Sequence, residues 1–282
     1  MPEGNIIHRL ARVHRRWLVG RRFTADSPQG RFAAEAPHLS GRVLEDVRAH
    51  GKHLFHHFEG GVRLHVHLGL FGTIRHFRAQ AAPPSPACRL RLASPHATLQ
   101  LSGPQTCELL TPDAEAALRA RLGEDPLHAD ASPERAFAAL RQVRAPIATA
   151  LLDQSRISGV GNILRAEALF LARLSPHLPA IELRAPDFER LWTALRQLLE
   201  DAARDGRIVP PHAPPTALTR PGRRREDRFC VYDREDLPCP LCATPVARVP
   251  LAGRSLFFCP RCQAPRRRAA RARLPLPHPQ QE

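Results

Sequence analysis

Two cysteine pairs near the end of the chain constrain its fold more than any other feature. The first pair lies in PCPLC at 238–242 and the second in CPRC at 259–262, so two CxxC pairs are separated by sixteen residues. Tetrahedral zinc binds four thiolates in two chelating pairs, and a short hairpin between the pairs closes such a site. We therefore predict a zinc ribbon with one structural zinc ion. Its ligands are Cys239, Cys242, Cys259 and Cys262.

Two disulfides are the alternative for the same spacing. The chain shows no secretory signal, because Glu3, Arg9 and Arg12 place charge at its start, and no apolar run approaches the roughly 20 residues that cross a bilayer. We therefore expect a cytoplasmic protein with no membrane partner, in which thiolates stay reduced and bind metal. A ribbon of this size has little core of its own, so the metal should hold it folded, with Arg254 at its tip.

The charge balance points to a polyanionic partner. The 282 residues carry a net charge of +15 and a pI near 11.2, and nucleic acid is the commonest partner of a soluble protein with such a charge. Lys52 is nevertheless the only lysine, all other basic side chains except histidine being arginine. A lysine amine is compact and can lose its proton, which arginine does not do. Lys52 is therefore a candidate functional residue, and chance survival of one lysine is the alternative.

The N-terminus combines a helix with an unusual terminal amine. Residues 3–18 have apolar positions at helical spacing. Pro2 follows Met1, whose removal would expose the secondary amine of proline. An α-amino group titrates near ~8, so part of it is nucleophilic at neutral pH, and its iminium adduct would act as an electron sink. Glu3 could pass protons at the same centre. Ordinary helix capping is the alternative reading of both residues.

Residues 20–110 are strand-like. The segments 53–58 and 62–72 read as a hairpin, and CRLRLAS with ATLQLSG reads as a second one, which predicts a β-sandwich or flattened barrel. Leu70 and Phe71 form an apolar tip between two glycines, which would be odd unless they contact something or are buried. Histidines crowd these strands, but alternation spreads them over both faces, so packed or solvated histidines are favoured over metal ligands. They are His50, His53, His56, His57, His65, His67 and His76.

From Thr111 the apolar period becomes helical. Helices are expected within 111–123, 132–143, 145–154, 163–173 and 187–203. The third and fourth are joined by the glycine-rich turn SRISGVGN, and Asn162 stands where the fourth begins. Free N–H groups at that helix start would suit a phosphate, although a plain helical hairpin is the alternative.

These elements predict an α+β protein with four parts. We expect an N-terminal helix and β-sandwich lobe at 1–128, a helical lobe with a Pro/Arg-rich loop at 129–228, the zinc ribbon at 229–264, and a disordered basic tail at 265–282. The tail would add only salt-sensitive attraction for a polyanion.

Several motifs together resemble the formamidopyrimidine-DNA glycosylase and endonuclease VIII family of bacterial DNA repair enzymes. The resemblance covers residues 2–263, and the PEG start is closer to the endonuclease VIII branch. In family order the motifs are PEG at 2–4, GKHLF at 51–55, HLGLFG at 67–72, LGEDPL at 122–127, SGVGNI at 158–163, VYDR at 231–234 and GRSLFFCPRCQ at 253–263. The turn SRISGVGN then corresponds to the helix-two-turns-helix motif of the family.

The resemblance implies a bifunctional DNA glycosylase/AP lyase of base excision repair. Pro2 would be the nucleophile that forms a Schiff base with the sugar, and Glu3 the proton donor. Lys52 and Arg254 would complete the catalytic set by gripping the sugar or phosphates beside the lesion. The strand would then be cut by successive β- and δ-elimination, with no redox cofactor.

The same resemblance implies contacts to damaged DNA. Leu70 would be a wedge that enters the base stack when the damaged nucleotide flips out, Asn162 would bind a flanking phosphate, and Arg121 would be a further contact. The partner would be double-stranded DNA with oxidised bases, pyrimidines preferred, or abasic sites. A monomer associated with the nucleoid is expected.

Some residues depart from the family pattern. Asp233, Asp236 and Ala243 stand where family members often have glycine, and no arginine near Gln105 matches the one that the purine branch places against the orphaned base. Two other functions stay open on sequence alone. One is a non-catalytic zinc protein that binds damaged or bent DNA, and the other is a zinc-ribbon RNA-binding or transcription factor.

Overall fold

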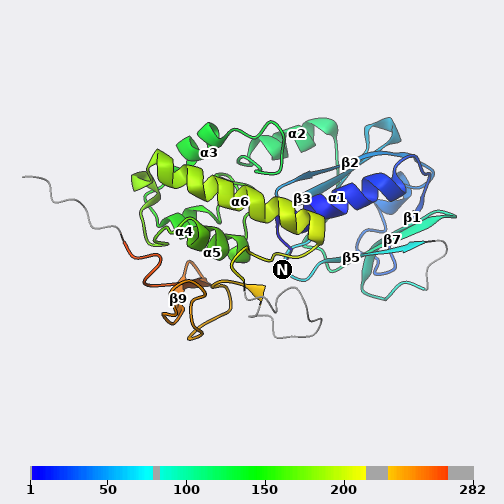
Figure 1. Cartoon of the computed structure of the whole chain (residues 1–282). Coiled ribbons are helices and arrows are strands. Elements are labelled where there is room, and N and C mark those ends of the chain that lie inside the picture. Colours follow the sequence, from blue (N-terminus) through cyan, green and yellow to red (C-terminus); the bar gives the residue numbers. More distant parts are fainter. Residues whose placement is uncertain (1, 79–82, 214–227, 266–282) are drawn as a thin grey trace, which may run out of the picture.

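The N-terminal helix connects the two lobes of the molecule. The computed structural model describes residues 2–78, 83–213 and 228–265. Figure 1 shows a strand-rich lobe and a helical lobe side by side, with the start of the chain between them. This arrangement confirms the α+β class. Most of the predicted Pro/Arg-rich loop (214–227) and the predicted tail (266–282) lie outside the described residues, and the domain boundaries stay a prediction.

The strand-rich lobe is a sandwich of two antiparallel four-stranded sheets, with orders β2-β3-β4-β8 and β1-β6-β7-β5. Alternating apolar side chains meet between the sheets, for example Leu54 and Val66 from one sheet and Leu99 from the other. Both predicted hairpins are present, as β3-β4 and β6-β7. The strands are β1 (Thr24–Asp26), β2 (Leu44–His50), β3 (His53–Phe58), β4 (Arg63–His67), β5 (Thr73–Arg78), β6 (Cys88–Ala93), β7 (Ala97–Ser102) and β8 (Thr106–Leu110).

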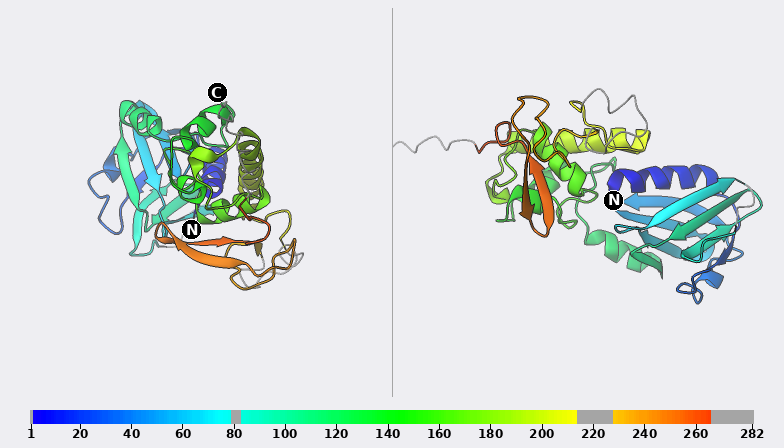
Figure 2. Two further views of the ribbon diagram at one scale, coloured as in Figure 1. Left: turned by 90° about the vertical axis from the view of Figure 1, so that its left-hand side faces the viewer. Right: turned by 90° about the horizontal axis from the view of Figure 1, so that it is seen from below.

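Helix α1 (Gly4–Leu18) forms because its apolar residues repeat at helical spacing. Ile7, Ala11 and Leu18 are buried in the sandwich core. The helix also contacts α6 (Ala185–Asp205) of the other lobe, so it joins the two halves (Figure 2).

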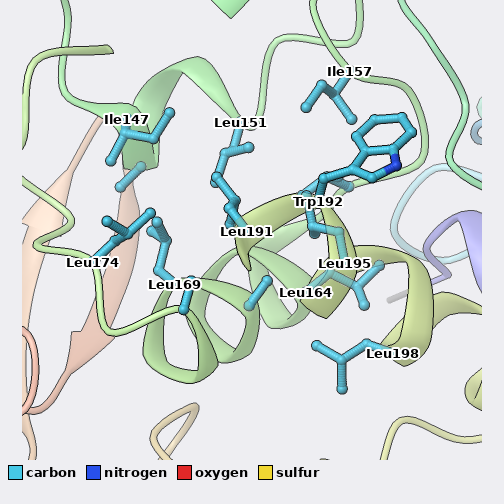
Figure 3. Close-up of a cluster of buried hydrophobic side chains, with 14 of the residues drawn as sticks. Ile147, Leu151, Ile157, Leu164, Leu169, Leu174, Leu191, Trp192, Leu195 and Leu198 are labelled. Carbon is cyan, nitrogen blue, oxygen red and sulfur yellow. The ribbon is translucent and has the colours of Figure 1, made fainter. Parts of the chain in front are cut away.

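The helical lobe packs around α5, in which every residue from Asn162 to Phe170 is buried. Leucines of α5 and α6 form its core with Trp192 (Figure 3). Prolines at the first turn and side-chain caps from Thr111 and Ser132 start α2 and α3. The helices are α2 (Pro112–Ala120), α3 (Pro133–Leu140), α4 (Ile147–Ala150), α5 (Asn162–Leu171) and α6 (Ala185–Asp205), with short 3-10 helices η1 (Ala36–His38), η2 (Glu59–Gly61) and η3 (Ala180–Glu182).

The C-terminal hairpin consists of β9 (Ala247–Leu251) and β10 (Arg254–Phe258) and packs on α5. The two turn residues, Ala252 and Gly253, both have positive φ, as a tight hairpin turn requires. Phe257 and Val246 of this region join Phe170 of α5 in a small apolar cluster. Among the described residues, no helix is long and apolar enough to span a membrane.

Candidate active site

Three glycines bring distant parts of the chain together at the site. The N–H of Gly4 donates to the carbonyl of Gly159 at 2.9 Å. A Cβ on Gly4 would lie 2.8 Å from the Cα of Gly159, and a Cβ on Gly51 would lie 2.7 Å from the Cβ of Ser158. Only glycine allows such close backbone approach. The chain start, the turn before Lys52 and the turn before α5 therefore meet at one point.

Glu3 is buried at the N-terminus of α5. Its carboxylate accepts hydrogen bonds from the N–H groups of Gly161, Ile163 and Leu164 at 3.1, 2.9 and 3.2 Å. Burial raises the pKa of Glu3, while the nearby charge of Lys52 and these hydrogen bonds act in the opposite direction. A buried carboxyl with a raised pKa can hold a proton for transfer.

The expectation that these N–H groups are free to bind a phosphate is wrong. Gly161, Ile163 and Leu164 already donate to Glu3. The helix dipole and the free donors do attract an anion, as expected, but the anion is a carboxylate of the same chain.

Lys52 lies beside Glu3. Its Nζ donates to the carbonyl of Val160 at 2.7 Å. Burial lowers the pKa of Lys52, Glu3 raises it, and Arg254 lowers it further. The amine is therefore flanked by an acid and by the hairpin arginine. Pro2, which is half-buried, precedes Glu3 directly and so lies at the same place.

Asn162 and the hairpin are held together by a residue that the sequence did not single out. Arg165 is fully buried and donates to the Oδ1 of Asn162 and, at 3.0 Å, to the carbonyl of Ser255. The side-chain amide of Asn162 donates to the same carbonyl at 3.0 Å. Since Ser255 follows Arg254, these bonds fix the hairpin tip against the start of α5. Two charged residues, Arg165 and Glu167, inside the mostly apolar run NILRAEALF were the signal available in the sequence.

An open pocket of about 840 Å³ joins the hairpin to the apolar tip. Its lining includes Leu70 and Phe71 of the apolar tip together with Asn162 and Arg254. Leu70 is 57% exposed and Phe71 84%, the highest values among the large hydrophobic side chains of the described residues. Arg121 is exposed at the end of α2 and is not among the residues that line this pocket.

Two acids outside the predicted set support the site. Asp125 accepts a hydrogen bond from the N–H of Gly51 at 2.6 Å and so fixes the turn before Lys52. Glu167 of α5 accepts from the N–H groups of Cys230, Val231 and Tyr232, which anchors the chain that enters the ribbon. Burial raises the pKa of Glu167. Asp125 falls within the motif LGEDPL, but its partner could not be read from the sequence.

The strand histidines bond to separate partners, among them other histidines and carboxylates, instead of converging on a point. The Nδ1 of His53 lies 2.9 Å from the Nε2 of His65, whose Nδ1 lies 2.8 Å from Glu108. The Nδ1 of His14 lies 2.8 Å from the Nε2 of His56. Within the ranges that the structure describes, none of the strand histidines belongs to a group of three or more metal-ligating side chains.

The four ribbon cysteines have the geometry of a zinc site. All four Sγ atoms lie within 4.8 Å of one another. The Sγ atoms of Cys239 and Cys262 are 3.9 Å apart, and those of Cys242 and Cys259 are 3.5 Å apart. Zinc–sulfur bonds of about 2.3 Å in a tetrahedron place the sulfurs about 3.8 Å apart, so the four thiolates fit one zinc ion. The cysteines are free, which excludes the disulfide alternative.

Comparison with known proteins identifies the family of this chain. The Endonuclease 8 1 protein of Mycobacterium tuberculosis is 41% identical over 273 residues, which cover 93% of this chain and 100% of that protein. The chain belongs to the formamidopyrimidine-DNA glycosylase family. Three family models match it: the formamidopyrimidine-DNA glycosylase N-terminal domain at 1–109, the H2TH domain of the same enzyme at 122–210, and the zinc finger found in FPG and IleRS at 236–265.

Other members of the glycosylase family agree in sequence and fold. The formamidopyrimidine-DNA glycosylase of Thermus thermophilus is 38% identical over 236 residues, which cover 79% of this chain and 83% of that protein. The crystal structure of MutM (Fpg) from Thermus thermophilus superposes with a TM-score of 0.75 and 31% identity, covering 93% of this chain and 98% of that one. A MutM structure in complex with carbocyclic 8-oxo-G containing DNA has a TM-score of 0.79 at 23% identity, covering 94% and 100%.

Membership confirms the predicted family, enzyme class and structural zinc ion. The protein is a DNA glycosylase of base excision repair, in a family of DNA glycosylase/AP lyases. The non-catalytic DNA-binding and transcription-factor alternatives are thereby set aside.

Proposed function

We propose that the protein removes oxidised bases, with pyrimidines preferred, through a Schiff base on Pro2 and then nicks the strand by β,δ-elimination. The observation that carries the proposal is Glu3, which is buried on the N-terminus of α5, faces the charge of Lys52 and directly follows Pro2. A proton donor and a nucleophilic amine thereby stand side by side. The preference for pyrimidines is supported by the 41% identity to an endonuclease 8 protein.

The first step uses the Pro2 nitrogen and a proton from Glu3. The uncharged amine attacks C1′ of the damaged nucleotide, and the bond from C1′ to the base breaks with its electron pair. The carboxyl of Glu3 supplies a proton at this centre, which its raised pKa makes available. The Pro2 nitrogen then loses its own proton to the Glu3 carboxylate, which passes it to O4′ as the sugar ring opens, and this gives an iminium between Pro2 and C1′.

The second step follows from the permanent charge of that iminium. A secondary amine leaves no N–H to lose, so the iminium withdraws electrons and acidifies the proton on C2′. Loss of that proton expels the 3′ phosphate, and a further elimination expels the 5′ phosphate. Hydrolysis then releases the sugar remnant and frees Pro2. No oxidant or reductant enters this sequence.

The partner that fits the surface is duplex DNA with a damaged base or an abasic site. In this proposal Lys52, Asn162 and Arg254 contact phosphates around the lesion, because Asn162 and Arg254 line one open pocket and Lys52 lies close to Arg254. Leu70 and Phe71 line the same pocket and would fill the stack when the nucleotide rotates out. Arg121 stays a predicted contact outside this pocket.

Borohydride trapping tests the proposal. Reduction with an abasic duplex oligonucleotide should leave a covalent complex whose peptide adduct maps to Pro2. Pro2→Gly keeps a terminal amine but makes it primary, so trapping should become slower, and protein that retains Met1 should not trap at Pro2. Equal trapping by all three forms, or an adduct at Lys52, would contradict the assignment. Mass spectrometry of the purified N-terminus provides the control for methionine removal.

A further inference from the structure

Three metal-ligating side chains meet at a second place, outside both the ribbon and the proposed active site. His8 comes from α1, while Asp125 and His128 come from the segment between α2 and α3. One ligand atom from each lies within 4.8 Å of the other two. The Nε2 of His8 is 2.7 Å and the Nε2 of His128 is 3.6 Å from the same oxygen, Oδ2 of Asp125. The proposed reaction uses neither histidine.

The bottom of this three-residue cluster is buried, and its opening is accessible to solvent. The Asp125 side chain is 1% exposed, whereas His8 and His128 are 18% and 22% exposed. Both histidines line a pocket of about 590 Å³ that extends between α1 and α6. Two histidines and one carboxylate that leave positions open to water are a recurrent ligand set for divalent transition metals.

Neighbouring groups could orient the ligands. The second oxygen of Asp125, Oδ1, accepts the N–H of Leu127 at 3.0 Å, which leaves Oδ2 directed to the histidines. The Nδ1 of His128 lies 3.8 Å from the exposed carboxylate of Asp130. A carboxylate behind a ligating histidine favours the tautomer that presents the Nε2 lone pair.

Metal binding here must displace existing interactions. His8 is hydrogen-bonded to Asp125, and the Nε2 of His128 lies 2.8 Å from the carbonyl of Ala49. Arginines also line the pocket, and their positive charge opposes the binding of a cation. Two of them, Arg15 and Arg48, are partly neutralised because both pair with Asp46. These costs make the site weaker than the four-thiolate ribbon and favour an ion with high affinity for imidazole.

We propose that His8, Asp125 and His128 form a second divalent-metal site, for Zn²⁺ or a similar transition ion. The site borders the turn that carries Lys52, because the Oδ2 of Asp125 also accepts the N–H of Gly51 at 2.6 Å. Metal binding is independent of the proposed base-removal chemistry, so either proposal can fail without the other.

Cobalt titration tests the site in full-length protein that carries one zinc ion in its ribbon. Calorimetry should show one Co²⁺ bound per chain, with weak visible absorption and without the intense sulfur-to-cobalt band of a cysteine site. Total zinc should stay at one per chain. No Co²⁺ binding, or binding with the sulfur band and zinc release, would overturn the proposal.

Variants assign the ligands. His8→Gln keeps a side-chain donor for Asp125 but is a poor transition-metal ligand, so Co²⁺ affinity should fall at least about tenfold. His128→Gln should lower the Co²⁺ affinity by a similar factor. His96→Gln is the matched control, since His96 is exposed and outside the cluster, and it should bind as the wild type does. Equal affinities in all four proteins would exclude these ligands, and thermal melts of each variant show that the fold is kept.

Discussion

The carboxylate of Glu3 accepts a hydrogen bond from the backbone N–H of Ile163 at 2.9 Å. Glu3 and Ile163 are 160 residues apart in the sequence. The contact therefore joins the start of the chain to α5, the helix that follows the glycine-rich turn. The same helix carries Asn162, which bonds to the hairpin beside Arg254. One helix N-terminus therefore positions Glu3, Pro2 directly before it and the hairpin.

Glu3→Gln should separate the two chemical steps. Glutamine can still accept the N–H groups of α5 but cannot donate a proton as an acid. Excision of an oxidised base should therefore slow by about 10²- to 10⁴-fold, while an abasic site, which has no base to expel, should still be trapped by borohydride. Equal losses on both substrates would argue that Glu3 only supports the fold.

The pH dependence of base excision should reflect the protonation of Glu3. Burial raises the pKa of Glu3, so its protonated form survives to higher pH than that of an exposed glutamate, and excision falls as pH rises through that raised pKa. The amine of Pro2 has the opposite requirement, because it must lose its proton. Single-turnover rates should therefore trace a bell whose alkaline limb disappears in Glu3→Gln.

Lys52→Arg should be as damaging as Lys52→Met. The Nζ of Lys52 lies 2.7 Å from the carbonyl of Val160 in a partly buried position, and a planar guanidinium cannot reproduce the contact of this compact ammonium. We expect kcat/KM on lesion DNA to fall about 100-fold in both variants. Arg48→Lys, on the exposed side of β2, provides the control and should stay near wild type. Full activity of Lys52→Arg would show that only charge matters.

Leu70 and Phe71 should contribute to DNA binding by replacing the stacking contacts that are lost when the damaged nucleotide rotates out. Alanine at both positions should weaken lesion-duplex binding by about 1–3 kcal/mol, because the replaced stacking contact is lost. The loss should shrink on a mismatched or single-stranded substrate, where less stacking has to be broken. Ile181→Ala removes another exposed apolar side chain and should change neither affinity. Fluorescence anisotropy with the lesion duplex, the mismatched duplex and the single-stranded substrate measures the difference.

Zinc removal should abolish incision but leave most of the helical signal. The ribbon has its own small apolar cluster on α5 and adds Leu256 to the core of the helical lobe, but that core is built mainly from residues of the lobe's own helices. Loss of metal would release Arg254 from its place beside Asn162. Circular dichroism and incision assays after chelation test this, and a global loss of helix would contradict it.

The periodic parts of the fold could be predicted from the sequence, but the contacts that build the site could not. The hairpin of β3 and β4 and the start of α5 at Asn162 follow from local alternation and turn residues. The junction of Gly4, Gly51 and Gly159 depends on packing between segments far apart in the chain. The N–H groups of α5 looked free because a carboxylate so distant in sequence gives no local signal.

Backbone strain in the ribbon gives a stability prediction. Ala243 and Ala252 have φ values of 60° and 50°, in the left-handed region where a Cβ is unfavourable. Asp233 and Asp236 share this conformation, which aspartate tolerates better. The departures from glycine noted in the sequence therefore fall on strained positions.

Replacing the two alanines by glycine should relieve that strain. Ala243→Gly and Ala252→Gly should each stabilise the ribbon by about 0.5–1 kcal/mol, the relieved strain less the added entropy of the unfolded chain. Zinc release to a chelator should become slower as a result. Ala247→Gly, in strand β9, is the matched control and should speed release, because glycine weakens a strand. If all three variants release zinc faster than the wild type, the left-handed alanines are not a source of strain, and ribbon stability is set by side-chain packing alone.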